Sequence, residues 1–248
     1  MNLEIKDHFI VQWKKYFRNA DLPITFYYTD NPVNAVMVQS SSKWNCLICE
    51  LKKVRAGESL AFNFEALKCG GAKRYLGFTD KMRPKFEYFL SCGIENEMEG
   101  ERYKRTPELV RELMKNQKKL DINGKYIVFK RWDSLNEYDN PDVVVFFVTP
   151  DILSGLFTLA NYDQSEPNST ITPFGAGCGS IVHYPYLEKD SQQPRAVIGM
   201  FDVSARPCVP AEFLTFSVPM IKFTKMIGYM DESFLNTNSW KEVQKRIK

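Results

Sequence analysis

The sequence has little histidine and no long hydrophobic run. Its two histidines, His8 and His183, are too few for a metal centre built on histidine. The longest unbroken apolar run, Val143–Val148, has six residues, whereas a membrane-spanning helix needs about 20. Residues 1–7 lack the basic start and apolar core of a signal peptide. These absences predict a cytoplasmic protein with no membrane partner.

The chain also lacks a strong charge of either sign. It has 33 Lys and Arg against 30 Asp and Glu, a net charge of +3. A dedicated nucleic-acid binder usually carries a stronger basic footprint, so we expect no nucleic-acid partner. The 248 residues, 44% hydrophobic and 25% charged, are typical of a soluble globular protein with a sizeable core.

Six cysteines are present, and in a reducing cytosol they are expected to be free thiols. Cys46 and Cys49 have the C-x-x-C spacing of a redox or metal motif. No second C-x-x-C exists, which excludes a zinc ribbon. The pair is therefore interpreted as buried apolar thiols on a helix.

Two turns recur when the chain is compared with itself at an offset of 109 residues. Asp30-Asn31-Pro32 falls on Asp139-Asn140-Pro141, and Cys69-Gly70 falls on Cys178-Gly179. The pattern of elements around these anchors predicts an α/β (or α+β) fold. We expect two similar βαβ-containing halves, related by a pseudo-two-fold axis that arises from internal duplication. The alternative is two unrelated βα stretches whose turns are similar by chance.

Hydrophobic periodicity predicts the elements within this frame. An amphipathic N-terminal helix covers Leu3–Phe17, and helices are expected at 45–56, from Pro150, from the Thr106-Pro107-Glu108 start and from Met220. Strands are expected at 33–38, 59–64, 85–90, 143–148, 169–173 and 195–201. The expected organisation is an N-terminal helix (1–20), a first α/β repeat (21–124), a second α/β repeat (125–235) and a helical C-terminal tail (236–248).

The two Cys-Gly turns are the main site prediction. Each turn precedes a possible helix, whose free amides attract anions and lower the pKa of a thiol, and glycine lets the backbone approach a ligand closely. Cys69 and Cys178 are the candidate catalytic residues. The alternative is that both are small side chains packed under tight turns. The candidate ligand-binding glycines are Gly70, Gly71, Gly175, Gly177 and Gly179.

Three arginines near predicted helix starts extend this site. Arg102, Arg105 and Arg206 could bind a small anionic molecule, because guanidinium groups match carboxylate and phosphate. The alternative for these arginines is pairing with the acids Glu99, Glu101 and Asp202.

A four-thiolate site is a further option. Cys69, Cys92, Cys178 and Cys208 could hold an iron–sulfur cluster, although their spacing matches no local cluster motif. No other cofactor and no oligomeric state follow from the sequence.

Several strings carry a family resemblance. They are Gly100-Glu101-Arg102-Tyr103 with Thr106-Pro107-Glu108, Pro141-Asp142-Val143-Val144-Val145, Pro173-Phe174-Gly175-Ala176-Gly177-Cys178 and Ser204-Ala205-Arg206-Pro207. Over roughly residues 30–235 the chain resembles the prokaryotic family catalogued as domain of unknown function 169. The resemblance implies a cytosolic prokaryotic protein with relatives in archaea and anaerobic bacteria, and it implies no activity.

Three functions follow as hypotheses. The first is a small-molecule-binding protein or enzyme, with an anionic ligand held between the halves at the Cys-Gly turns. The second is a cysteine-based redox or iron–sulfur protein. The third is a structural interaction module.

Overall fold

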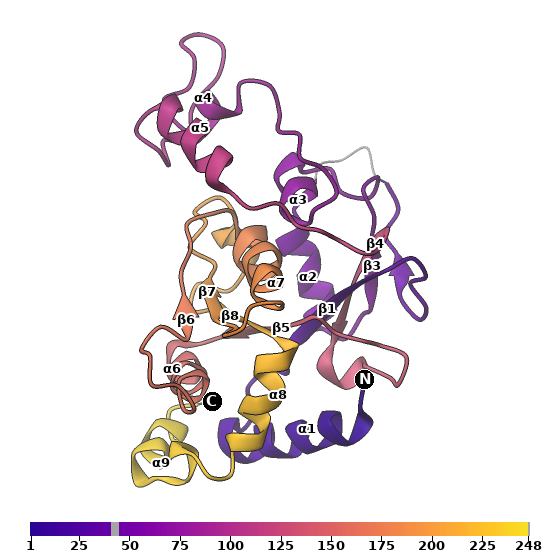
Figure 1. Cartoon of the computed structure of the whole chain (residues 1–248), viewed down its shortest axis with the longest axis vertical. Coiled ribbons are helices and arrows are strands. Elements are labelled where there is room, and N and C mark those ends of the chain that lie inside the picture. The colour runs from indigo at the N-terminus through magenta and orange to yellow at the C-terminus, as the bar shows by residue number, and fades with distance from the viewer. Residues whose placement is uncertain (41–44, 248) are drawn as a thin grey trace.

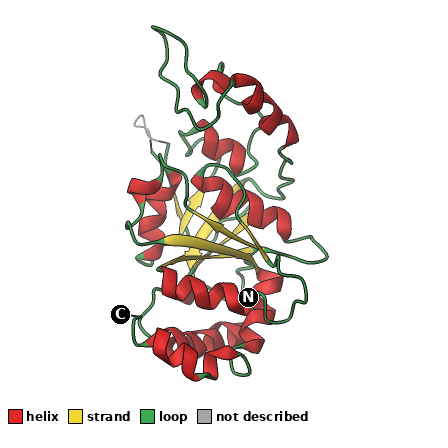
Figure 2. Ribbon diagram, turned by 90° about the vertical axis from the view of Figure 1, so that its left-hand side faces the viewer, coloured by secondary structure: helices red, strands yellow, loops and turns green. Residues whose placement is uncertain are grey.

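One eight-stranded sheet lies between two layers of helices in the computed structural model (Figures 1 and 2). The structure describes residues 1–40 and 45–247, and residues 41–44 and 248 lie outside the described part of the chain. The mixed α/β fold predicted from the sequence is confirmed. The strands are β1 (Ile24–Thr29), β2 (Val36–Met37), β3 (Leu60–Phe62), β4 (Tyr126–Arg131), β5 (Val143–Val148), β6 (Thr170–Ile171), β7 (Ala196–Gly199) and β8 (Leu214–Pro219).

The strand order is β2-β3-β4-β1-β5-β8-β7-β6. Counted inward from its own edge, each half contains its second, third, fourth and first strand in that order. The two outermost pairs, β2 with β3 and β6 with β7, are parallel, and all other neighbours are antiparallel. We call β2, β3, β4 and β1 the first half of the sheet, and β5, β8, β7 and β6 the second half.

Internal duplication at an offset of 109 residues is not confirmed. That offset aligns residues 34–39 with residues 143–148, yet the first segment holds the edge strand β2 and the second is the central strand β5. In the sheet, the strand that corresponds to β5 is β1, because each is the innermost strand of its half. Strand β4, which begins at Tyr126, completes the first half of the sheet.

Each face of the sheet has its own apolar core, covered by its own helices. On one face the core includes residues of α2, α3, η2 and α7. On the other it includes residues of α1, α6, α8 and α9. The helices of the first face, with the adjacent turn η3, are α2 (Leu47–Arg55), α3 (Gly70–Tyr75), the π-helical turn η2 (Gly179–His183), α7 (Tyr184–Glu188) and η3 (Arg206–Cys208). The second face, with the turns η1 and η4, has α1 (Leu3–Phe17), η1 (Trp132–Ser134), α6 (Pro150–Ala160), α8 (Met220–Tyr229), η4 (Phe234–Asn236) and α9 (Asn238–Gln244).

Local sequence explains several of these elements. Helix α1 has the bounds that the sequence predicts, because the Asn2 side chain accepts a hydrogen bond from the Glu4 amide at 2.8 Å and caps the helix. Its aromatic stripe is buried against the sheet. Strand β5 is six buried apolar residues, as expected for a strand covered on both faces. None of the helices in the described part of the chain is long and apolar enough to cross a membrane.

A lobe made of α4 (Phe86–Phe89) and α5 (Pro107–Asn116) projects from the sheet (Figure 1). The strand predicted at 85–90 is wrong, since this segment forms α4 and does not join the sheet. Lys85 enters the helix with a positive φ of 60°, which turns the chain away from an extended path. The start of α5 agrees with the sequence: Thr106 caps it through the Leu109 amide, and Pro107 follows at the first helical position.

A buried ion pair fixes the connection between β4 and β5. The Lys130 ammonium donates to the Asp139 carboxylate at 2.7 Å, with side-chain exposures of 1% and 3%. The same carboxylate accepts from the Tyr27 hydroxyl at 2.5 Å and from the Asn136 amide at 2.8 Å. Residues 132–142 pass over β1 here, since β1 lies between β4 and β5. The pair is thus fully hydrogen-bonded at the junction of the two halves.

We expect Lys130→Met to lower the free energy of unfolding by roughly 3–5 kcal/mol, because it leaves the Asp139 carboxylate buried without its cation. The matched control is Lys85→Met, which removes the exposed Lys85–Glu97 pair and should cost at most about 1 kcal/mol. Urea unfolding followed by tryptophan fluorescence measures both variants. Equal losses in the two would contradict the assigned role of the buried pair.

Candidate functional site

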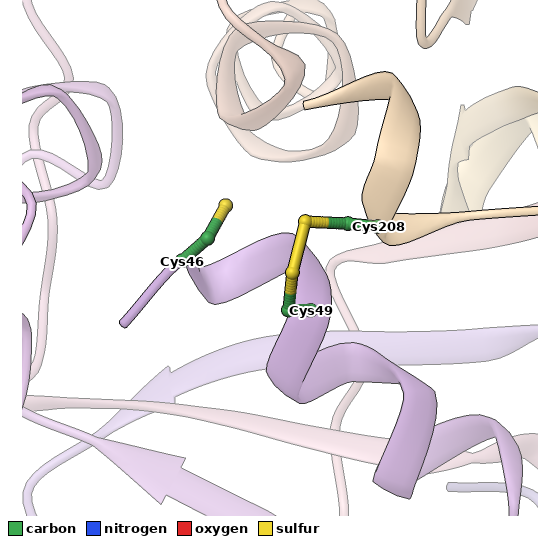
Figure 3. A group of neighbouring side chains, drawn as sticks. All are labelled: Cys46, Cys49 and Cys208. Carbon is green, nitrogen blue, oxygen red and sulfur yellow. A yellow bond between two sulfur atoms is a disulfide. The ribbon is translucent and has the colours of Figure 1, made fainter. Parts of the chain in front are cut away.

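Three cysteine sulfurs meet where α2 begins. The Sγ atoms of Cys46, Cys49 and Cys208 all lie within 4.8 Å of one another. Cys49 and Cys208 form a disulfide, although 159 positions separate them in the sequence, and their Cα atoms are 4.7 Å apart. Figure 3 shows the Cys46 side chain beside this bridge, at the start of α2. The site therefore holds one thiol next to one disulfide.

The bridge corrects the expectation that all six cysteines are free thiols. That expectation is wrong for Cys49 and Cys208. Cys49 lies on α2, which connects β2 to β3, while Cys208 ends η3, which lies between β7 and β8. The bridge therefore links the two halves of the sheet. Such a pairing depends on contacts between distant segments and cannot be obtained from the spacing of the cysteines.

The C-x-x-C pair has the setting that redox motifs require. Cys46 is the N-cap residue of α2, with φ −94° and ψ 127°, and Cys49 follows in the first turn. The helix joins two parallel strands, β2 and β3. A C-x-x-C pair at a helix N-terminus within a βαβ unit is the arrangement of thiol redox sites. The interpretation of the pair as buried apolar thiols is wrong, because Cys46 is half-buried and Cys49 is exposed and bridged to Cys208. The C-x-x-C spacing was the signal in the sequence that pointed to this position.

Opposing effects act on the Cys46 thiol. The pKa of Cys46 lies above its ordinary value: burial raises it most, the backbone amides of Cys49 and Ile48 offset part of that increase, and the charges of Cys69 and Asp202 add to it. The amides belong to the helix N-terminus, whose partial positive charge favours a thiolate. Cys49 is the exposed residue of the bridge, whereas Cys208 is half-buried.

The predicted catalytic candidates Cys69 and Cys178 lie near this site. Cys69 is the N-cap residue of α3 and is half-buried, while Cys178 precedes η2 and is buried. Complete burial raises the pKa of Cys178 well above its usual range, and the nearby charges of Cys69 and Cys46 raise it further. The two Cys-Gly turns thus bring their thiols into one neighbourhood, outside the group of three sulfurs within 4.8 Å.

Protein groups occupy the surroundings of most of the predicted ligand-binding glycines. The Gly177 amide donates to the Asp202 carboxylate at 2.8 Å, so this amide already has an anionic partner. A Cβ at Gly177 would lie 3.3 Å from Ile48 and Met200. Gly175 and Gly179 lie equally close to side chains of α3 and α7, and Gly71 lies beside its neighbour Cys69. A Cβ at Gly70 would meet only open space.

Arg206 is held by the protein rather than directed at a ligand. Its guanidinium donates to the carbonyls of Phe213 at 2.6 Å, Ala211 at 2.7 Å and Met200 at 3.5 Å. These bonds fix the loop that carries Cys208, two residues further along the chain. Arg206 therefore contributes to the position of the bridge.

The other predicted groups lie on the lobe. Arg102 and Arg105 are exposed, in the segment that precedes α5. Arg102 borders a surface hollow together with exposed Cys92, and this hollow is also lined by Glu95, Glu97 and Glu99. Clustered carboxylates disfavour an anion. The structure does not bring Cys92 together with Cys69, Cys178 and Cys208, since the group among the described residues is Cys46, Cys49 and Cys208.

His183 lies buried in η2, next to the Cys-Gly turn of Cys178. Its exposed fraction is 2%, and within the described chain neither ring nitrogen has a hydrogen-bond partner. The ring packs edge-on against Tyr75 at 5.5 Å and Tyr184 at 5.1 Å between centroids. Burial lowers the pKa of His183 to about 4, so the imidazole is neutral at physiological pH.

Comparison with known proteins gives a family and no function. A family model, DUF169, described as uncharacterised ArCR, matches residues 14–228. This is the family that the sequence strings resemble, and that prediction is confirmed. No curated protein and no solved structure matches the chain. The roles of the cysteines therefore have to come from the geometry of this chain.

We expect the free energy of unfolding to fall as pH drops below about 6.5, the ordinary pKa of histidine. Between pH 6.5 and 4 the unfolded chain binds a proton at His183 that the folded chain does not, so acid favours unfolding. The full loss, complete below about pH 4, is roughly 3 kcal/mol.

Urea unfolding at pH 7.5 and pH 5 measures this dependence in three proteins. His183→Gln should flatten the pH dependence, whereas His8→Gln, at an exposed position on α1, should keep it. An undiminished pH dependence in His183→Gln would show that the dependence arises from other groups.

Proposed function

The chain belongs to the DUF169 family, which carries no assigned activity, and we propose from its own sulfur atoms that it is a cysteine-based redox protein. The reaction is thiol–disulfide exchange among Cys46, Cys49 and Cys208. The observation that carries the proposal is the Cys46 thiol beside the Cys49–Cys208 bridge, with all three sulfurs within 4.8 Å. Exchange proceeds by attack of a thiolate on a disulfide sulfur, and this arrangement supplies both reactants.

The first step begins at the exposed end of the bridge. The thiolate of a reacting dithiol attacks Sγ of Cys49, and the bond between Cys49 and Cys208 breaks. Cys208 leaves as a thiolate and takes a proton from solvent. Cys49 then carries the dithiol as a mixed disulfide. The exposure of Cys49 favours attack at this sulfur over the half-buried Cys208.

Two outcomes can follow from the mixed disulfide. If the second thiol of the dithiol attacks its own bridged sulfur, a substrate disulfide leaves and Cys49 and Cys208 remain as thiols. Two electrons have then passed to the protein. If Cys46 loses its proton and attacks Sγ of Cys49, a Cys46–Cys49 bridge forms and the dithiol is released unchanged. The second route moves the bridge without net oxidation.

A cytoplasmic location fits this chemistry. Disulfides in reducing compartments are mostly transient ones that serve catalysis or redox sensing. A bridge with an exposed residue and a neighbouring thiol is suited to such turnover. Binding of a small anion at the Cys-Gly turns stays a prediction, and we prefer exchange because Arg206 and the Gly177 amide are engaged by protein groups.

We expect both bridges to appear when the oxidised protein is incubated with a trace of dithiothreitol. Acid quenching, alkylation of free thiols and peptide mass spectrometry distinguish Cys49–Cys208 from Cys46–Cys49. Cys46→Ser should show only the first bridge and Cys208→Ser only the second, because each variant lacks one of the competing thiols.

Cys92→Ser is the matched control, since Cys92 is exposed on the lobe and outside the group of three sulfurs. It should give the same two bridges as the unmodified protein. If the unmodified protein never forms the Cys46–Cys49 bridge, the proposed exchange is wrong.

A further inference from the structure

We propose that the reduced protein binds one soft divalent metal ion of the Zn²⁺ class on the thiolates of Cys46, Cys49 and Cys208. The inference rests on the same three cysteines as the proposed function, but it needs only their reduced state. It assigns these residues a second chemistry, in which they act as ligands rather than as redox partners.

The distances suit such an ion. A Zn–S bond is about 2.3 Å long, so thiolates around one tetrahedral ion lie roughly 3.8 Å apart. All three sulfurs already lie within 4.8 Å of one another while the bridge is closed. Opening the Cys49–Cys208 bridge allows these two sulfurs to separate to the ligand spacing. With the bridge closed the Cα atoms of Cys49 and Cys208 are 4.7 Å apart, and rotation of the two side chains then increases the separation of the sulfurs.

The ligands sit on two fixed supports. Cys46 and Cys49 provide the C-x₂-C half of the site, the ligand spacing common in zinc proteins. They lie at the N-terminus of α2, whose partial positive charge favours thiolates. Cys208 ends η3, where its amide donates to the Ala205 carbonyl at 3.0 Å and the Arg206 guanidinium binds three carbonyls. Supported ligands hold a preorganised site.

Three protein ligands leave a fourth position open. Cys69 and Cys178 lie outside the 4.8 Å group, and Cys178 is packed in the apolar core. Cys49 is exposed, so water or a small thiol can reach the ion from that side. An open position is the mark of reactive rather than purely structural zinc sites. The site therefore fits an ion that binds a small thiol or water.

Metal binding and oxidation exclude each other at this site. Either bridge, Cys49–Cys208 or Cys46–Cys49, removes two of the three thiolates. A metal ion needs all three as deprotonated ligands. Oxidation must therefore release the ion, and bound metal must protect the thiols from forming a bridge.

The test uses the full chain, reduced, stripped of metal and kept without oxygen. Co²⁺ serves as the probe, because tetrahedral thiolate coordination gives it strong visible absorbance. We expect the absorbance to saturate at one Co²⁺ per chain and to disappear when Zn²⁺ is added. The oxidised protein should show none. Absence of thiolate-to-cobalt absorbance in the reduced protein overturns the proposal.

Single substitutions then identify the ligands. Cys46→Ser, Cys49→Ser and Cys208→Ser should each weaken Co²⁺ binding by more than about tenfold, since loss of even a supporting partner costs 10–100-fold. Cys69→Ser and Cys92→Ser are the matched controls and should keep the affinity of the unmodified protein. Unchanged binding in Cys46→Ser, or loss of binding in Cys69→Ser, overturns the three-cysteine assignment.

Two further measurements keep the outcomes separate. Far-UV circular dichroism of reduced Cys46→Ser, compared with the reduced unmodified protein, distinguishes lost binding from lost folding. The disulfide mapping described above is repeated with a chelator present. Exchange without metal binding overturns the metal site alone, and metal binding without exchange overturns the redox function alone.

Discussion

The arrangement of the whole sheet depends on one buried charge pair. Lys130 on β4 and Asp139 in the following connection neutralise each other on the face that α1 covers. This connection leads the chain from β4 past β1 to β5, which pairs with β1. The pairing of β1 with β5 joins the two halves of the sheet. The contact between α2 and η3, which the Cys49–Cys208 bridge closes, is a second connection between the same two halves.

The candidate site arises because both crossovers lie on the same face. Helix α2 joins the parallel pair β2 and β3, and the η2–α7 segment joins the parallel pair β6 and β7. Both pack into one core, with Cys46 before the first crossover and Cys178 before the second. The thiols therefore lie close together because the strand order places both crossover segments on one face of the sheet. No short segment of the chain contains them all.

Local sequence was sufficient for the elements that local forces define. Leu3–Phe17 has a capping residue and an apolar stripe, and Val143–Val148 is an apolar run of strand length, so both could be predicted. Residues 85–90 could not, because a short aromatic stretch has no period that distinguishes a strand from one helical turn. The bridge between Cys49 and Cys208 was out of reach for another reason. It joins residues from opposite halves of the sheet, and only the assembled topology places them together.

The separation of the bridged cysteines, 159 positions, changes the covalent connectivity of the molecule. When oxidised, the chain is a closed ring with two tails: the N-terminal tail carries α1, β1 and β2, and the C-terminal tail carries β8, α8 and α9. Cutting the backbone once inside the ring leaves a single covalent molecule, whereas the same cut in the reduced chain yields two pieces. In the chain-entropy account, a ring of this size stabilises the fold by roughly 5 kcal/mol. A shift of the bridge to Cys46–Cys49 would open the ring and release that constraint while the oxidation state stays unchanged.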